Sequence, residues 1–157
     1  MSYNRNRIAG AIRSRLAADL IGARDLTGSP FPVSADGLPA YALQLQQISA
    51  QVAGIGSRDF IVEDRANVFA WAVGDQSIEA ALWAFADELA EIVHRAPEDL
   101  GGLVERMVPA GAEVQAFPAA ARVWGLQFSI DLLYIETPSP TIEAADFSAG
   151  FSLGFRA

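Results

Sequence analysis

The sequence predicts an α+β fold: a mainly antiparallel, four- to five-stranded sheet with two helices packed on one face. Two segments, 5–21 and 75–95, carry apolar residues at helical spacing. Three others, 38–48, 58–73 and 124–134, alternate apolar and polar residues with a period of two. Helices whose apolar stripes are one-sided need a sheet face to cover them, which favours two layers.

The first helix is predicted over residues 5–21. Ile8, Ile12, Leu16 and Leu20 follow one another at intervals of four, which places them on one face. The next stretch, 22–39, contains three glycines and three prolines and is predicted to be a long connection.

Two strands come next, separated by a glycine-containing loop around Gly54–Ser57. Over 38–48, Tyr41, Leu43 and Leu45 share one face. Over 58–73, the apolar alternation at the start and at the end is separated by Glu63, Asp64 and Arg65. The phase of the pattern slips across these polar residues, which indicates a bulge or a twist.

The second helix is predicted over 75–95, with Asp75 or Ser77 as its cap and Pro97 beyond its end. Its apolar stripe comprises Ile78, Leu82, Phe85, Leu89 and Ile92. We expect a short turn of helix within 98–108 and a short strand at 113–117. The clearest strand follows, because six large apolar residues alternate strictly: Trp124, Leu126, Phe128, Ile130, Leu132 and Tyr134.

The last segment is predicted to be a separate arm. Thr137–Pro140 contains two prolines and divides a single domain at 1–136 from an arm at 137–157. The arm alternates apolar residues with serine and glycine, and its large apolar side chains are Phe147, Phe151, Leu153 and Phe155. Such a pattern favours an arm that docks on a partner by strand addition, or an extra strand that closes the protein's own sheet.

Composition excludes several classes of protein. The net charge is −8 and the chain has no lysine, which argues against a surface that grips nucleic acid. It has no cysteine, which excludes disulfides, thiolate zinc sites and cysteine nucleophiles. No stretch of 18 uncharged apolar residues is present, so no membrane span is expected, and the N-terminus does not have the pattern of a signal peptide.

The residues that usually carry chemistry are sparse. His94, the only histidine, lies at the predicted end of the second helix, where an imidazolium would favour the helix dipole. The carboxylate groupings Glu63–Asp64 and Glu88–Glu91 are most simply solvated faces. No phosphate-binding loop occurs, and Gly54–Gly56 is a weak match to a dinucleotide fingerprint. We therefore predict no catalytic residue, no metal site and no cofactor, and we do not expect an enzyme.

The order of elements and several short stretches resemble the tail terminator proteins of long-tailed bacteriophages. The resemblance covers residues 5–136 and has no invariant motif. The stretches that carry it are 7–16 in the first helix, 38–40, 69–73 leading into 81–90, 100–104, and 123–134.

The resemblance implies a structural protein of the virion tail or neck, assembled in the host cytoplasm. Such proteins form a homohexameric ring on the tail tube, stop its polymerisation and provide the surface for head–tail joining. The implied partners are further copies of the chain, the tail tube protein and a neck or stopper protein. DNA would pass through the lumen without specific binding, and an acidic lumen would let it slide. The arm would then dock on a neighbouring subunit or on the tube protein.

Two alternatives remain open. One is another neck component, a stopper or head-completion protein, for which a dodecameric ring would be expected. The other belongs to a different class: a stand-alone α+β domain that binds a small ligand or catalyses a reaction through carboxylates. A monomer with a closed apolar pocket would favour that class.

Overall fold

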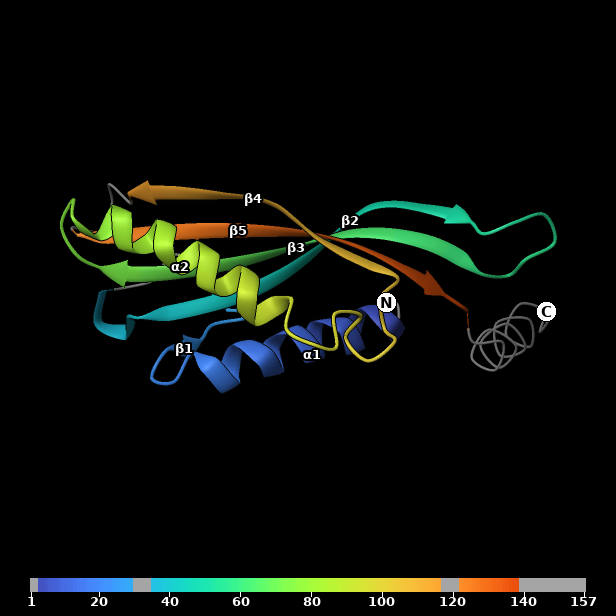
Figure 1. Ribbon diagram of the computed structural model, residues 1–157, viewed down its shortest axis with the longest axis horizontal. Coiled ribbons are helices and arrows are strands. Elements are labelled where there is room, and N and C mark those ends of the chain that lie inside the picture. Colours follow the sequence, from blue (N-terminus) through green and yellow to red (C-terminus); the bar gives the residue numbers. More distant parts are fainter. Residues whose placement is uncertain (1–2, 30–34, 117–121, 139–157) are drawn as a thin grey trace, which may run out of the picture.

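The computed structural model describes residues 3–29, 35–116 and 122–138, which form one elongated sheet with two helices (Figure 1). The helices are α1 (Tyr3–Asp19) and α2 (Ile78–Val93), and a 3-10 turn spans Ala35–Gly37. The strands are β1 (Arg24–Asp25), β2 (Ala40–Val52), β3 (Phe60–Val73), β4 (Arg106–Ala116) and β5 (Val123–Glu136).

The five strands lie in the order β1-β2-β3-β5-β4. Only the short β1–β2 pairing is parallel, and the other three pairings are antiparallel. Both helices lie on one face, where α1 contacts α2 and β2, and α2 contacts β5 and β4 (Figure 1). The predicted α+β class, sheet and helix layer are confirmed. No helix of the described residues has both the length and the apolarity that a membrane crossing requires.

The core lies between the helices and this sheet face, as the apolar patterns predict. Ile8, Ile12 and Leu16 of α1 are fully buried, and so are Leu89 of α2 and Ile130 of β5. Phe128 is also buried in the same cluster, so the even-numbered face of β5 packs where the sequence predicts. The sheet and the stripes of both helices therefore enclose the main hydrophobic core. A smaller buried cluster of Ala40, Ala42, Trp71 and Val123 is separate from it.

The polar middle of β3 does not contain the predicted change of phase. β3 pairs with β5 in one unbroken register from Phe60 to Val73. The predicted bulge does occur at this point of the sheet, but in the partner strand: the register shift lies in β2, between Gln47 and Ser49, directly opposite Asp64 and Glu63. Apolar residues lie on both faces of β3. In the sequence alone, this looks like a change in the phase of the apolar–polar alternation.

Three other local features differ from the prediction, although the strand expected at 113–117 is present as part of β4. Residues 98–103 form hydrogen-bonded turns in place of a helical turn, with Leu100 in the left-handed region. The strand expected at 113–117 begins earlier, at Arg106, and a register shift between Pro109 and Gly111 accommodates the proline. β1, inside the predicted connection, was missed because two residues carry no periodicity.

Candidate functional site

His94 occupies the structural position expected of it. It is the C-cap of α2, and its Nδ1 lies 2.9 Å from the carbonyl oxygen of Ala90. Its Nε2 is buried and has no hydrogen-bond partner among the described residues. No carboxylate or hydroxyl is hydrogen-bonded to the imidazole within this described part, so the geometry offers no catalytic pair around it.

Asp64 corrects the expectation that the Glu63–Asp64 pair is a solvated face. Its side chain is completely buried beneath α1, and Arg5 holds both carboxylate oxygens at 2.6 and 2.7 Å. The Tyr134 hydroxyl donates a third hydrogen bond at 3.0 Å. The hydrogen bond to Asp64 raises the pKa of Arg5, against the opposing effect of burial. This triad attaches the start of α1 to β3 and β5.

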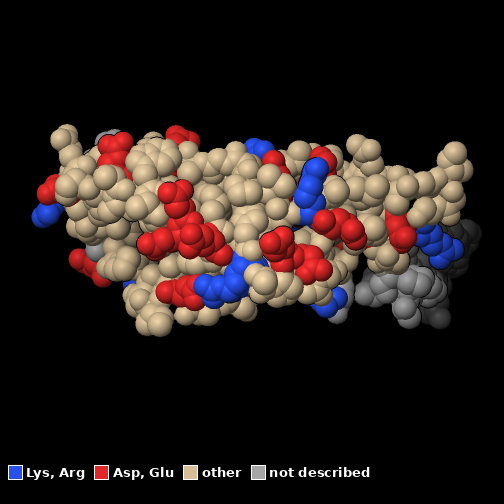
Figure 2. Space-filling model, viewed as in Figure 1, with Lys and Arg blue, Asp and Glu red and all other residues tan. Residues whose placement is uncertain are grey.

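The carboxylates of α2, which include the predicted grouping Glu88–Glu91, do lie in solvent. Glu79, Asp87, Glu88 and Glu91 are exposed, and the helix contains no basic residue. Acidic side chains gather across the middle of the helix-bearing face (Figure 2). Within the described ranges, no three histidine, cysteine or acidic side chains come together as a metal site would require.

The most unusual feature is the hairpin of β2 and β3, which projects beyond α1 at one end of the molecule (Figure 1). It carries exposed large apolar side chains, which are normally scattered singly on a soluble surface. These are Ile48, Val52, Ile55, Phe60 and Ile61, joined by Ile135 at the end of β5. Ile135 is paired with Ile61 on one face of the sheet, and Val52 is paired with Phe60 on the other, so the set covers both faces of the projecting end. We call these six residues the hairpin patch.

The sheet face opposite the helices has a polar centre. Ser129 donates a 2.8 Å hydrogen bond to the side-chain oxygen of Asn67, and Gln127 approaches the same oxygen at 3.3 Å. Arg65 and Asp131 pair across the strands at 2.8 Å. These contacts satisfy the side chains locally and leave no polar group aimed at a ligand among them.

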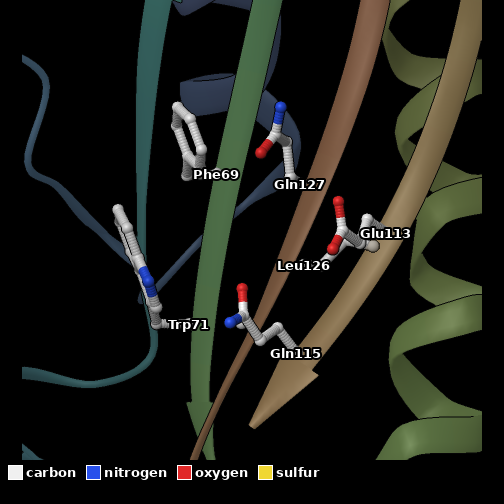
Figure 3. A pocket seen from close by; sticks show the side chains of 7 residues that line it. Phe69, Trp71, Glu113, Gln115, Leu126 and Gln127 are labelled. Atoms are coloured by element: carbon white, nitrogen blue, oxygen red, sulfur yellow. The ribbon is translucent and has the colours of Figure 1, made fainter. Parts of the chain in front are cut away.

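Phe69 and Trp71 lie beside this polar centre, stacked with their ring centroids 6.0 Å apart. Figure 3 shows both rings turned to the β2 side of β3, away from Glu113 and Gln115. The hollow between these groups is only about 60 Å³, well below the 300 Å³ or so at which small-molecule pockets begin. It is too small for a drug-sized ligand.

A larger hollow lies at the opposite side of Phe69, along the outer edge of β2. Its volume is about 520 Å³. Its lining is formed by the loop after β1, by β2 and by one β3 side chain: Leu26, Thr27, Gly28, Ser29, Ala42, Leu43, Gln44, Leu45 and Phe69. We call it the β2 hollow. Sequence analysis missed it because the loop and the strands that form it are far apart in the chain.

The predicted interface residues Phe147, Phe151, Leu153 and Phe155 lie outside the described residues. The described part of the chain ends at residue 138, just after β5. There the Thr137 hydroxyl donates a 2.7 Å hydrogen bond to Asp59 in the β2–β3 loop. The chain therefore leaves the domain at the projecting end of the sheet, beside the hairpin patch.

No protein-family model matches this chain, and no curated protein matches it either. Three features of the surface therefore carry the functional argument: the apolar hairpin patch, the acidic face of α2 and the apolar β2 hollow.

Proposed function

We propose that this protein is a non-enzymatic structural component that assembles into a ring, in the manner of a tail terminator. The hairpin patch is the observation that carries the proposal. It places six exposed large apolar residues on the two faces of one end of an elongated molecule, where no helix covers the described sheet. Exposed apolar groups of this kind mark interaction surfaces, because water solvates them poorly. The patch would meet a neighbouring copy or the tail tube protein.

A closed ring requires heterologous contacts, in which one surface of a subunit meets a different surface of the next. The hairpin patch and the β2 hollow lie along different halves of β2, and so provide two different apolar surfaces. The exposed acids of α2 suit a bore through which DNA passes without being gripped, since like charges repel. In this proposal α2 lines the lumen.

Two measurements test the proposal: the mass of the assembled protein, and the length of the tail tubes that form in its presence. The purified protein is expected to form a hexamer, measured by native mass spectrometry and by counting subunits in electron micrographs. Added to polymerising tail tube protein, it is expected to shorten the tubes in proportion to its concentration. A dodecamer that leaves tube length unchanged would favour a stopper or head-completion protein instead. A monomer at every concentration would contradict the ring.

The β2 hollow supports one candidate of a different class. Its 520 Å³ falls within the size range of small-molecule pockets, and its lining is mostly apolar. A stand-alone domain that binds a small apolar ligand would use it. Thermal unfolding against a panel of apolar ligands separates the two candidates, because only the ligand-binding domain is expected to gain several degrees in melting temperature as a monomer.

A further inference from the structure

The outer edge of β2 is an open place in the sheet. β1 pairs with β2 only at Ala40 and Tyr41, and no other described strand lies on that side. Thr27 accepts a hydrogen bond from the Leu43 amide at 3.0 Å. In an antiparallel ladder alternate residues direct their backbone groups outward, so Leu45 and Gln47 present theirs next along this edge.

Edge strands of soluble proteins are normally protected against pairing by charge, proline or a bulge. β4, the other edge, has such protection: Arg106 and Glu113 supply charge, and Pro109 interrupts the strand. β2 has a single register shift but no charged residue and no proline in its 13 residues. The two edges of one sheet therefore differ in the way expected if β2 receives another strand.

The β2 hollow lies directly beside this edge and is lined by Leu26, Ala42 and Phe69 among others. The backbone of β2 at Tyr41 and Leu43 is already hydrogen-bonded to Leu26 and Thr27. A strand that adds to β2 therefore pairs from Leu45 onward and brings the side chains at one of its ends to this hollow. Recognition by strand addition combines such an edge, which pairs with backbone groups, with a hollow that selects side chains.

The sequence of this chain contains a segment with the matching chemistry. Residues 147–155 are uncharged, and if they form a strand, Phe147, Phe151, Leu153 and Phe155 would share one side, with serine and glycine between them. Pairing an uncharged segment with an uncharged edge leaves no charge to be desolvated. The segment is attached to the end of β5, at the projecting end of the sheet.

Topology leaves two sources for this segment. From the end of β5 the chain could pass the β2–β3 loop and reach the outer edge of β2 in its own molecule, which gives the strand order of a Greek key. The segment of a neighbouring copy could reach the same edge. The proposed ring favours the neighbouring copy, because the contact then joins two different surfaces of successive subunits.

We propose that residues 147–155 of one copy add as a strand to the outer edge of β2, from Leu45 onward, in a neighbouring copy, with one end of the phenylalanine row at the β2 hollow. This inference rests on the proposed assembly and names the contact that links its subunits. Donor and acceptor are different surfaces of the same chain, as a closed ring requires.

Cross-linking tests the contact directly, because the natural chain contains no cysteine. One full-length population carries Gln46→Cys, at an exposed position of β2, and a second, differently tagged population carries Ser152→Cys. After mixing and treatment with a short bis-maleimide, we expect covalent pairs that contain both tags. The control replaces Gln46→Cys with Val108→Cys, which is 45% exposed and lies on β4 at the opposite edge of the sheet, and we expect at least tenfold fewer mixed pairs.

The doubly substituted chain, Gln46→Cys with Ser152→Cys, distinguishes the sources of the arm. Cross-links within single molecules, without mixed pairs, would overturn the proposal and show that the arm closes its own sheet. Absence of both kinds of cross-link would also overturn it.

A charge placed on the edge provides the second measurement. Gln46→Lys is expected to reduce the assembled fraction at least tenfold at equal concentration, whereas Gln115→Lys, the same exposed substitution on β4, is expected to leave it unchanged. If both variants assemble normally and no mixed pairs form, this contact is wrong while the ring proposal stands. A wild-type protein that never assembles would contradict both.

Discussion

Among the individual residues, Arg5 has the largest structural role. It is the only described cation bonded to the fully buried Asp64, and it joins the first turn of α1 to the sheet. Removing one partner of a buried ion pair leaves the other charge without compensation, which costs far more than the pair contributes.

Arg5→Met is therefore expected to lower the free energy of unfolding by about 3–5 kcal/mol. The double variant Arg5→Met/Asp64→Leu is expected to recover most of that loss, because no charge is then left buried. Urea unfolding followed by circular dichroism measures both, and Arg58→Met, at an exposed position just before β3, is the control. A double variant as unstable as the single one would show that the triad is needed for more than charge balance.

Asp25 makes stability depend on pH in the acid range. Burial alone would raise the pKa of Asp25, but hydrogen bonds from Thr27 and Arg13 outweigh it and lower the pKa. A carboxylate whose pKa is lower when folded stabilises the protein above its unfolded pKa of about 3.9. That stability is lost as the pH falls through the folded pKa.

We expect Asp25→Asn to be less stable than the wild type at pH 6 and to approach it as the pH falls below about 4. Thermal unfolding at several pH values measures the difference. Asp36→Asn, at an exposed carboxylate, provides the comparison. A difference between Asp25→Asn and wild type that stays constant down to pH 2 would contradict this assignment.

His94 is expected to be dispensable for assembly. His94→Ala should lose about 0.3–1 kcal/mol of stability when the imidazole is protonated, from its place at the end of α2. Ring formation and tube shortening should be unchanged in the same preparations. A well-folded, assembled variant that no longer acts on tubes would reveal a ligand or catalytic role.

At the scale of the elements, α2 and β5 form the main contact of the core. The stripe of α2 and the even-numbered residues of β5 bury one another, and the projecting half of the β2–β3 hairpin has no such cover. Stability is thus concentrated where helices cover the sheet, and the uncovered end is available for contacts with other molecules.

Phe128→Ala tests that contact. The side chain is 4% exposed, and truncation of a buried aromatic leaves a cavity, so a loss of about 3–5 kcal/mol is expected. Ile21→Ala, at a 90% exposed position, should change stability by less than about 0.5 kcal/mol. Denaturant unfolding measures both, and a loss below about 1 kcal/mol for Phe128→Ala would contradict the packing.

At the scale of the whole molecule, the core and the assembly surfaces are separable. All the buried residues of the main cluster lie between Ile8 and Tyr134, before the arm begins. The domain at 1–136 therefore has a hydrophobic core that does not depend on described residues beyond it.

Deletion of 137–157 is expected to leave a folded, soluble protein that assembles poorly or fails to join its partner. Circular dichroism and thermal unfolding report the fold, and light scattering reports the assembly. Val108→Ser, at an exposed site on the opposite edge strand β4, should assemble normally. If the truncated chain unfolds, the segment is part of its own sheet and does not act as an arm.

The sequence by itself determined the fold class, the two helices, the long strands and the core residues, because these depend on periodicity within one segment. Ile8, Leu89 and Phe128 could be placed in the core from their spacing alone. Boundaries in weakly patterned regions, such as β1 and the start of β4, could not be, since two residues or a proline-containing edge carry little local signal.

Only the tertiary structure shows that Asp64 is buried and that the open edge of the sheet lies along β2. A carboxylate in the polar middle of a strand looks solvated until α1 brings Arg5 onto it from 59 residues away. The β2 hollow likewise joins a loop and two strands that have no common pattern in sequence. Contacts between segments that are distant in sequence determine which side chains are buried and which charges are paired. A local sequence pattern does not show which distant segment makes those contacts.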